Sequence, residues 1–89
     1  MICIPGSDEE FFGWIEANEV GFVVNSDKAK SAADLPMLHR AKCDHIYDRN
    51  WSSYTDHRFK LCSTSRQELE TWVEQHDRRE LKFCKDCAP

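Results

Sequence analysis

Two pairs of potential metal ligands lie far apart in the chain. Cys84 and Cys87 form a C-x-x-C pair near its end, a spacing that lets two thiolates bind one ion at about 2.3 Å. Upstream, His39 and Cys43 are separated by three residues and offer an imidazole and a third thiolate. The chain has five cysteines, an odd number that fits a closed disulfide framework poorly. These residues predict one bound Zn²⁺, which structural sites hold with four Cys or His ligands.

The spacing leaves the choice of upstream ligands open. Cys43 and His45 are close enough in sequence to chelate one ion, and Cys62 could replace a histidine. A thioredoxin-like redox role is disfavoured, because that motif opens a helix and only two residues follow Cys87. Four protein ligands leave no open coordination position, so the ion is expected to be structural and catalysis at the metal is disfavoured.

Two segments have the pattern of capped amphipathic helices. Ser7 can cap a helix, Glu10 completes a capping box three residues later, and an apolar stripe continues to about Asn18. Ser65 and Glu68 repeat the capping box before a second, more regular stripe. The residues that this second stripe places on one face are Leu69, Trp72, Val73 and His76. Trp14 and Trp72 are expected in the core.

Three short segments between these helices predict strands. Residues 22–24 are β-branched or aromatic, residues 37–40 lead into Cys43, and residues 59–62 alternate between apolar and other side chains. Residues 25–36 and 44–57 are polar and aperiodic, so irregular structure is expected there. The order of these elements predicts an α+β fold, with a small antiparallel sheet, two helices and a structural zinc knuckle.

Length and composition predict one globular domain over residues 1–89. Hydrophobic residues make up 40% of the chain and charged residues 31%, a balance that a disordered tail does not have. The apolar runs are far shorter than the roughly 20 residues of a membrane-spanning helix, so no membrane association is expected. The first ten residues are acidic and lack the apolar stretch of a secretory signal. An intracellular, cytoplasmic location is therefore expected.

Charge is distributed unevenly, although the net charge is only −4. Residues 1–27 carry six acidic residues and no Lys or Arg, whereas residues 28–62 carry seven basic residues against four acidic ones. The middle segment suits an anionic partner, although the net acidity argues against tight nonspecific DNA binding. Trp51 lies among these basic residues. Its ring could stack on an unpaired nucleobase, or it could fold back and cover the zinc knuckle. The predicted nucleic-acid contacts are Arg40, Lys42, Arg49, Trp51, Arg58 and Lys60.

The ligand pairs and their neighbours resemble a known family. The runs LHRAKC at 38–43 and FCKDCAP at 83–89 resemble the zinc-binding domain of the Ada DNA-repair family. The resemblance covers residues 37–89 and leaves residues 1–36 as an N-terminal helix and strand extension. It places Cys62 on a strand outside the site. The metal ligands that it implies are His39, Cys43, Cys84 and Cys87.

The chain departs from this family at the residue that carries its chemistry. In the Ada repair protein the first cysteine of the set accepts a methyl group as a zinc-bound thiolate, and His39 occupies that position here. An imidazole cannot do this, so the chain is not expected to be an enzyme. The 40 residues between Cys43 and Cys84 also exceed the spacing expected for the family. Members with a histidine occur as accessory modules joined to nuclease or other domains, which implies nucleic-acid targeting.

Two functions are compatible with these features. The first is a nucleic-acid recognition module with one structural Zn²⁺, an accessory domain of a nuclease or other DNA-processing protein, whose partner is DNA or RNA. The alternative is a protein-interaction adaptor or small regulatory subunit, whose acidic helix within residues 8–19 faces a basic partner. A basic face shared by residues 40–60 and Trp51 would favour nucleic acid, whereas surrounding acids would favour the adaptor.

Overall fold

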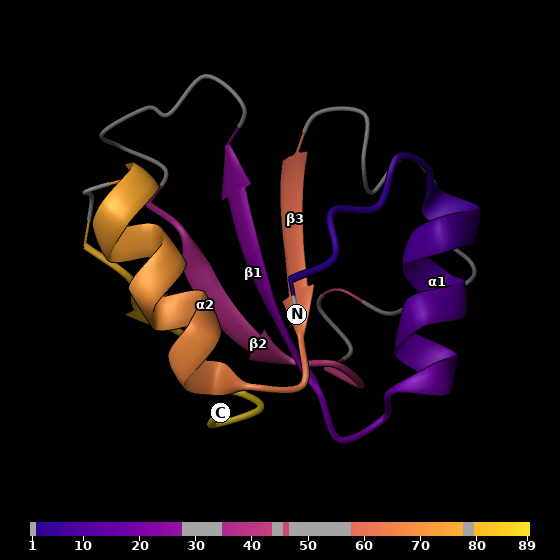
Figure 1. Ribbon diagram of the computed structural model, residues 1–89. Helices are drawn as coiled ribbons and strands as arrows, with labels where there is room; N and C mark the ends of the chain where they lie inside the picture. Colours follow the sequence, from indigo (N-terminus) through magenta and orange to yellow (C-terminus); the bar gives the residue numbers. More distant parts are fainter. Residues whose placement is uncertain (1, 28–34, 44–45, 47–57, 78–79) are drawn as a thin grey trace.

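The computed structural model describes residues 2–27, 35–43, 46, 58–77 and 80–89. The elements in chain order are α1 (Asp8–Ala17), β1 (Phe22–Asp27), β2 (Met37–Arg40), β3 (Arg58–Ser63), α2 (Arg66–Trp72), the π-helical turn η1 (Val73–Asp77) and β4 (Lys82–Phe83) (Figure 1). Both predicted helices and all three predicted strands are present, which confirms the α+β class.

Two predicted boundaries differ from the structure. Residues 25–27, expected to begin a loop, extend β1, and the second predicted helix changes from α-helical to π-helical hydrogen bonding after Trp72. The predicted irregular segment 44–57 lies outside the described residues, except for Ile46. None of the helices within the described ranges has both the length and the apolar character that a membrane crossing requires.

The sheet has the strand order β3-β1-β2-β4 and is mixed. β1 pairs antiparallel with β2 and with β3, as predicted. β4 pairs parallel with β2, where Met37 lies opposite Lys82 and Leu38 opposite Phe83. At this edge the sheet differs from the antiparallel one that we predicted. Because β2 and β3 both run against β1, and α2 reverses the chain after β3, β4 returns in the direction of β2.

One face of the sheet packs against α1. Val23 lies opposite both His39 and Cys62 in the register, so these three side chains point to the same side. All five cysteines pack in or against the hydrophobic cluster on this side. The helix residues buried in the same cluster are Phe11, Phe12 and Ile15. The face that carries His39 is therefore a covered, apolar one.

The opposite face packs against α2 (Figure 1). Val24 lies opposite both Leu38 and Leu61, and these three side chains form a second buried cluster. The cluster is completed by Leu69 and Val73. Trp14 and Trp72, both expected in the core, are half-buried at the margins of the two clusters. A helix thus packs against each face of the sheet.

Each helix begins at the serine that the sequence predicted. The Ser7 hydroxyl accepts the Glu10 N–H at 3.2 Å, and the Ser65 hydroxyl accepts the Glu68 N–H at 3.2 Å. Neither glutamate accepts the N–H of the capping serine, as it would in a regular capping box. Glu10 accepts the N–H of Gly6, the residue before Ser7, at 2.6 Å. Glu68 instead accepts the Ser63 hydroxyl at 2.7 Å, a bond that lowers the pKa of its carboxyl.

Gly21 and Gly13 provide a matched test of how α1 packs. A Cβ at Gly21 would lie 2.6 Å from Cη2 of Trp14 and 3.0 Å from the Asn18 carbonyl oxygen, whereas a Cβ at Gly13 would have no such atom within 4 Å. We expect Gly21→Ala to lower the free energy of unfolding by about 1–3 kcal/mol. Gly13→Ala should raise it by about 0.5–1 kcal/mol, because alanine favours the helix. Urea unfolding followed by circular dichroism measures both, and equal effects would contradict this packing.

Candidate metal centre

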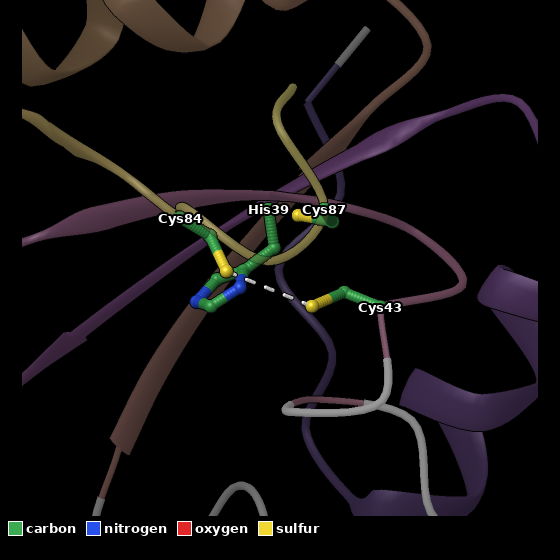
Figure 2. Close-up of side chains that lie close together, drawn as sticks. All are labelled: His39, Cys43, Cys84 and Cys87. Atoms are coloured by element: carbon green, nitrogen blue, oxygen red, sulfur yellow. Dashed lines mark hydrogen bonds between the residues drawn. The ribbon is translucent and has the colours of Figure 1, made fainter.

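The structure brings the four predicted ligand residues together. The ligand atoms of His39, Cys43, Cys84 and Cys87 all lie within 4.8 Å of one another. Figure 2 shows their side chains converging from β2, from the turn that follows it and from the C-terminal knuckle, residues 84–88. One imidazole and three thiols in this arrangement, here called the His–Cys cluster, could hold a metal ion.

A tight turn after β2 positions the upstream pair. The strand ends at Arg40, and the Cys43 N–H donates to the Arg40 carbonyl oxygen at 3.0 Å. The Ala41 N–H donates to the Gly21 carbonyl oxygen, also at 3.0 Å, which ties the turn to the start of β1. This reversal brings the Cys43 thiol back to the side of the sheet on which His39 lies.

The parallel pairing of β4 positions the downstream pair. The Cys84 N–H donates to the Leu38 carbonyl oxygen at 3.0 Å, which extends the pairing of β2 and β4 by one hydrogen bond. Cys84 is thereby placed beside His39. The Ala88 N–H donates to the Cys84 carbonyl oxygen at 3.1 Å and closes the knuckle, so Cys87 faces the same point.

The dimensions of the His–Cys cluster fit zinc. The Sγ atoms of Cys43 and Cys84 are 3.8 Å apart. A tetrahedral site with Zn–S bonds of about 2.3 Å places its sulfur atoms roughly 3.8 Å apart. Thiolates with one imidazole are also donors that Zn²⁺ prefers. His39, Cys43 and Cys84 are buried, with 4%, 5% and 5% of their surface exposed, while Cys87 is half-buried.

Hydrogen bonds favour the thiolate form of Cys84. Burial alone would raise the pKa of this thiol. The backbone N–H groups of Cys87 and Asp86, together with two neighbouring thiols, outweigh burial and hold the pKa of Cys84 below its ordinary value. Because the thiolate is the form that binds metals, the knuckle prepares this side chain for ligation.

Arg40 holds the knuckle from β2. Its backbone N–H donates to Cys87 Sγ at 3.2 Å, and its side chain donates from Nε to the Cys87 carbonyl oxygen at 2.8 Å. Nη2 donates to the Ala88 carbonyl oxygen at 3.1 Å. A fixed guanidinium fork thus positions two successive peptide groups, while a backbone donor faces the sulfur itself.

Arg66, the first residue of α2, contacts the two residues that flank the knuckle, Phe83 and Pro89. Its Nη1 donates to the Pro89 carbonyl oxygen at 2.7 Å, and its guanidinium lies 4.8 Å from the centre of the Phe83 ring. Between the two arginines, Ala88 has a φ of 46°, a left-handed conformation that alanine adopts only at an energetic cost. The two arginines therefore stabilise a backbone path that the local sequence does not favour.

Cys62, one of the two alternative ligands, is not part of the His–Cys cluster. Cys62 lies on β3, and β1 separates it from His39 on β2. It is fully buried and lies on a strand outside the site, as the resemblance implied. His45 lies outside the described residues.

The predicted nucleic-acid residues do not gather on one described surface. Lys42 forms an ion pair with Glu19 at 3.1 Å, and Lys60 is buried, donating to Asn25 Oδ1 and lying 5.7 Å from the centre of the Phe11 ring. Arg40 contacts the knuckle, as described above. Arg49, Trp51 and the side chain of Arg58 lie outside the described part of the chain. Arg40, Lys42 and Lys60, the three predicted contacts whose side chains the structure describes, thus have partners within the protein.

Sequence reasoning missed the internal roles of Arg40 and Lys60 for a physical reason. Alternation along residues 59–62 predicted a strand with one face in solvent, which would expose Lys60. Both faces are covered, so the alternation separates two buried clusters and Lys60 points toward α1. The bonds of Arg40 depend on contact with a segment 47 residues later. A capping or periodicity signal cannot report such a contact.

Comparison with known proteins yields no significant match to a protein-family model, to a curated protein or to a solved structure. The site is therefore defined by its own geometry.

Substitution of Arg40 tests its role in the His–Cys cluster. We expect Arg40→Ala to weaken metal binding by about 10–100-fold, because the knuckle loses both side-chain hydrogen bonds. Arg40→Lys keeps the positive charge but lacks the guanidinium fork, so its metal affinity should lie between those of the wild type and Arg40→Ala. Lys42→Ala is the control, since that ammonium pairs with Glu19. Competition with a chromophoric chelator measures the affinity, and equal affinities for the wild type and Arg40→Ala would disprove the positioning role.

Proposed function

We propose that the protein is a structural-zinc recognition module. The observation that carries this proposal is the convergence of His39, Cys43, Cys84 and Cys87 within 4.8 Å, in a geometry that fits a tetrahedral ion. Zn²⁺ is the ion that best suits three thiolates and one imidazole. Four protein ligands leave no position for a substrate or a water molecule, so we propose a structural ion and no enzymatic activity.

Zinc would contribute directly to folding in this chain. The His–Cys cluster links β2 to a knuckle that follows a strand of only two residues, and both residues of that strand are exposed. A short edge strand of this kind buries little apolar surface, and a small core gains stability from a structural ion. A reducing intracellular compartment, which we propose as the location, would keep the three thiols available as ligands.

Metal content and ligand substitutions test the zinc site. We expect one tightly held Zn²⁺ per chain, and we expect chelation at neutral pH to cause loss of tertiary structure. Cys43→Ser and Cys84→Ser should each abolish metal retention. Cys62→Ser is the matched control, since it removes a buried thiol of the same hydrophobic cluster and should keep the zinc. Elemental analysis and near-ultraviolet circular dichroism provide the measurements.

Replacement of the ion by Co²⁺ makes the outcome specific. A tetrahedral site with three thiolates gives strong sulfur-to-cobalt charge-transfer absorption, which weakens with each thiolate removed. A metal-free protein that keeps its full tertiary structure would contradict a folding role. Zinc retained by His39→Ala but lost from Cys62→Ser would show that the ligands are all cysteines.

The recognition target that we propose is nucleic acid, either DNA or RNA. The proposal is supported by the excess of bases in residues 28–62 and by the resemblance of residues 37–89 to the Ada zinc-binding domain. Because Arg40 and Lys60 have internal partners, we assign the main contacts to Arg49, Trp51 and Arg58, with Lys42 in a secondary role. In this proposal the module targets a joined nuclease or other DNA-processing domain to its substrate.

Binding assays with the zinc-loaded protein test this target. Affinity should fall steeply with salt, and Arg49→Ala and Arg58→Ala should each reduce the slope of log affinity against log salt by about 1. Trp51→Ala should cost about 1–3 kcal/mol on single-stranded oligonucleotides and less on duplexes. Lys82→Ala is the control, because that lysine, which lies on β4, pairs with Glu80. Fluorescence anisotropy at two or more salt concentrations gives these values.

A protein partner is the alternative function, and one observation favours it. Val20 is 86% exposed three residues after the end of α1, in a segment that also carries the exposed residues Glu16 and Glu19. An exposed apolar side chain next to acidic groups suits a basic protein surface. Folded, zinc-loaded protein without salt-sensitive binding to any DNA or RNA would reject the nucleic-acid proposal and favour this adaptor role.

A further inference from the structure

Two cysteines outside the His–Cys cluster lie directly opposite each other. The Cys3 N–H donates to the Cys62 carbonyl oxygen at 2.8 Å, and the Cys62 N–H donates to the Cys3 carbonyl oxygen at 2.9 Å. They form an isolated antiparallel bridge at the outer edge of β3. Residues that exchange both bonds in this way point their side chains to the same face. Both thiols are free and pack with the cluster under α1.

The backbone geometry of this pair is within reach of a disulfide. Residues in a hydrogen-bonded antiparallel pair have Cα atoms about 5.5 Å apart, and disulfides span Cα distances of about 4.4–6.8 Å. Their Cβ atoms, at about 4.5–5.5 Å, lie at or beyond the upper limit of roughly 4.5 Å for a relaxed disulfide. A bond formed here would carry some strain, and strained disulfides are the easily reduced ones.

The two thiols differ in accessibility. Cys62 is fully buried, whereas Cys3 is half-buried, so an oxidant in solution reaches Cys3 first. Burial, helped by the nearby Cys3 and opposed by Lys60, raises the pKa of Cys62 to about 12. Cys62 is therefore protonated at neutral pH and reacts less readily than Cys3 with an oxidant in solution, so its reaction depends on its position directly opposite Cys3.

We propose that Cys3 and Cys62 form a reversible disulfide site for low-molecular-weight disulfides such as oxidised glutathione. The Cys3 thiol attacks the disulfide, its sulfur bonds to one glutathione sulfur, and one reduced glutathione leaves with the proton. The Cys62 thiol then attacks Cys3 Sγ, and the second glutathione leaves with the Cys62 proton. Two cysteine thiols are oxidised and one glutathione disulfide is reduced to two thiols.

The bond would tie the N-terminal segment to the sheet. Cys3 is only four residues before Ser7, the residue that caps α1, and α1 covers the face on which the His–Cys cluster lies. Oxidation therefore fixes the start of the layer that shields the cluster. The proposal does not depend on the metal, because neither cysteine belongs to the His–Cys cluster.

Peptide mapping of the zinc-loaded chain after incubation with glutathione buffers of graded redox potential tests this site. We expect a non-reducing digest to contain one cross-linked peptide pair joining Cys3 to Cys62, with the loss of two hydrogen masses per chain. Zinc content should remain unchanged, and the cross-link should disappear with added reduced glutathione. Cys3→Ser and Cys62→Ser should each abolish it, and the wild type should melt at a higher temperature when oxidised.

Other oxidation products would overturn the proposal. A glutathione adduct that persists on Cys3 without a cross-link would show that Cys62 does not resolve it. The ligand thiols would be the reactive ones if cross-links form first among Cys43, Cys84 and Cys87. Zinc would then be lost before any bond joins Cys3 to Cys62. The two proposals can fail separately. If the purified protein contains no zinc but still forms the cross-link between Cys3 and Cys62, the zinc site is rejected and the disulfide site is supported.

Discussion

The parallel pairing of β4 with β2 is the constraint on which the His–Cys cluster depends. It carries Cys84 to the carbonyl of Leu38 and therefore to the side of His39. Yet β4 is two residues long and exposed, so it gains little from burial. Its position is stabilised from outside by the guanidinium groups of Arg40 and Arg66 and, in our proposal, by the ion. The pairing forms the site, and ligation in turn holds the pairing together.

The second organising feature is a sheet that is covered on both faces. α1 and the cysteines occupy one face, and α2 occupies the other. This arrangement explains why Lys60, a residue type that is rarely buried, lies inside with Asn25 and the Phe11 ring as partners. The other two bases of the middle segment whose side chains the structure describes, Arg40 and Lys42, instead have partners in the knuckle and in Glu19.

Local signals predicted the local structure well. Caps at Ser7 and Ser65 and apolar periodicity identified both helices, because each signal is contained within a few neighbouring residues. Spacing alone identified the C-x-x-C pair and left the upstream ligands open, and the resemblance implied the four residues that converge. The parallel edge, the knuckle contacts of Arg40 and the burial of Lys60 were not predicted. Each depends on which distant segment becomes a neighbour, and propensity or alternation does not contain that information.

The sheet also separates two kinds of thiol that the sequence does not distinguish. His39 and Cys62 point to the same side, but Val23 on β1 lies between them, so two strand spacings of about 4.8 Å hold them near 10 Å apart. A tetrahedral zinc site needs ligands roughly 3.8 Å apart, a separation that Cys62 cannot reach from β3. The same position places Cys62 opposite Cys3. The odd number of cysteines thus resolves into three that can share an ion and two that face each other.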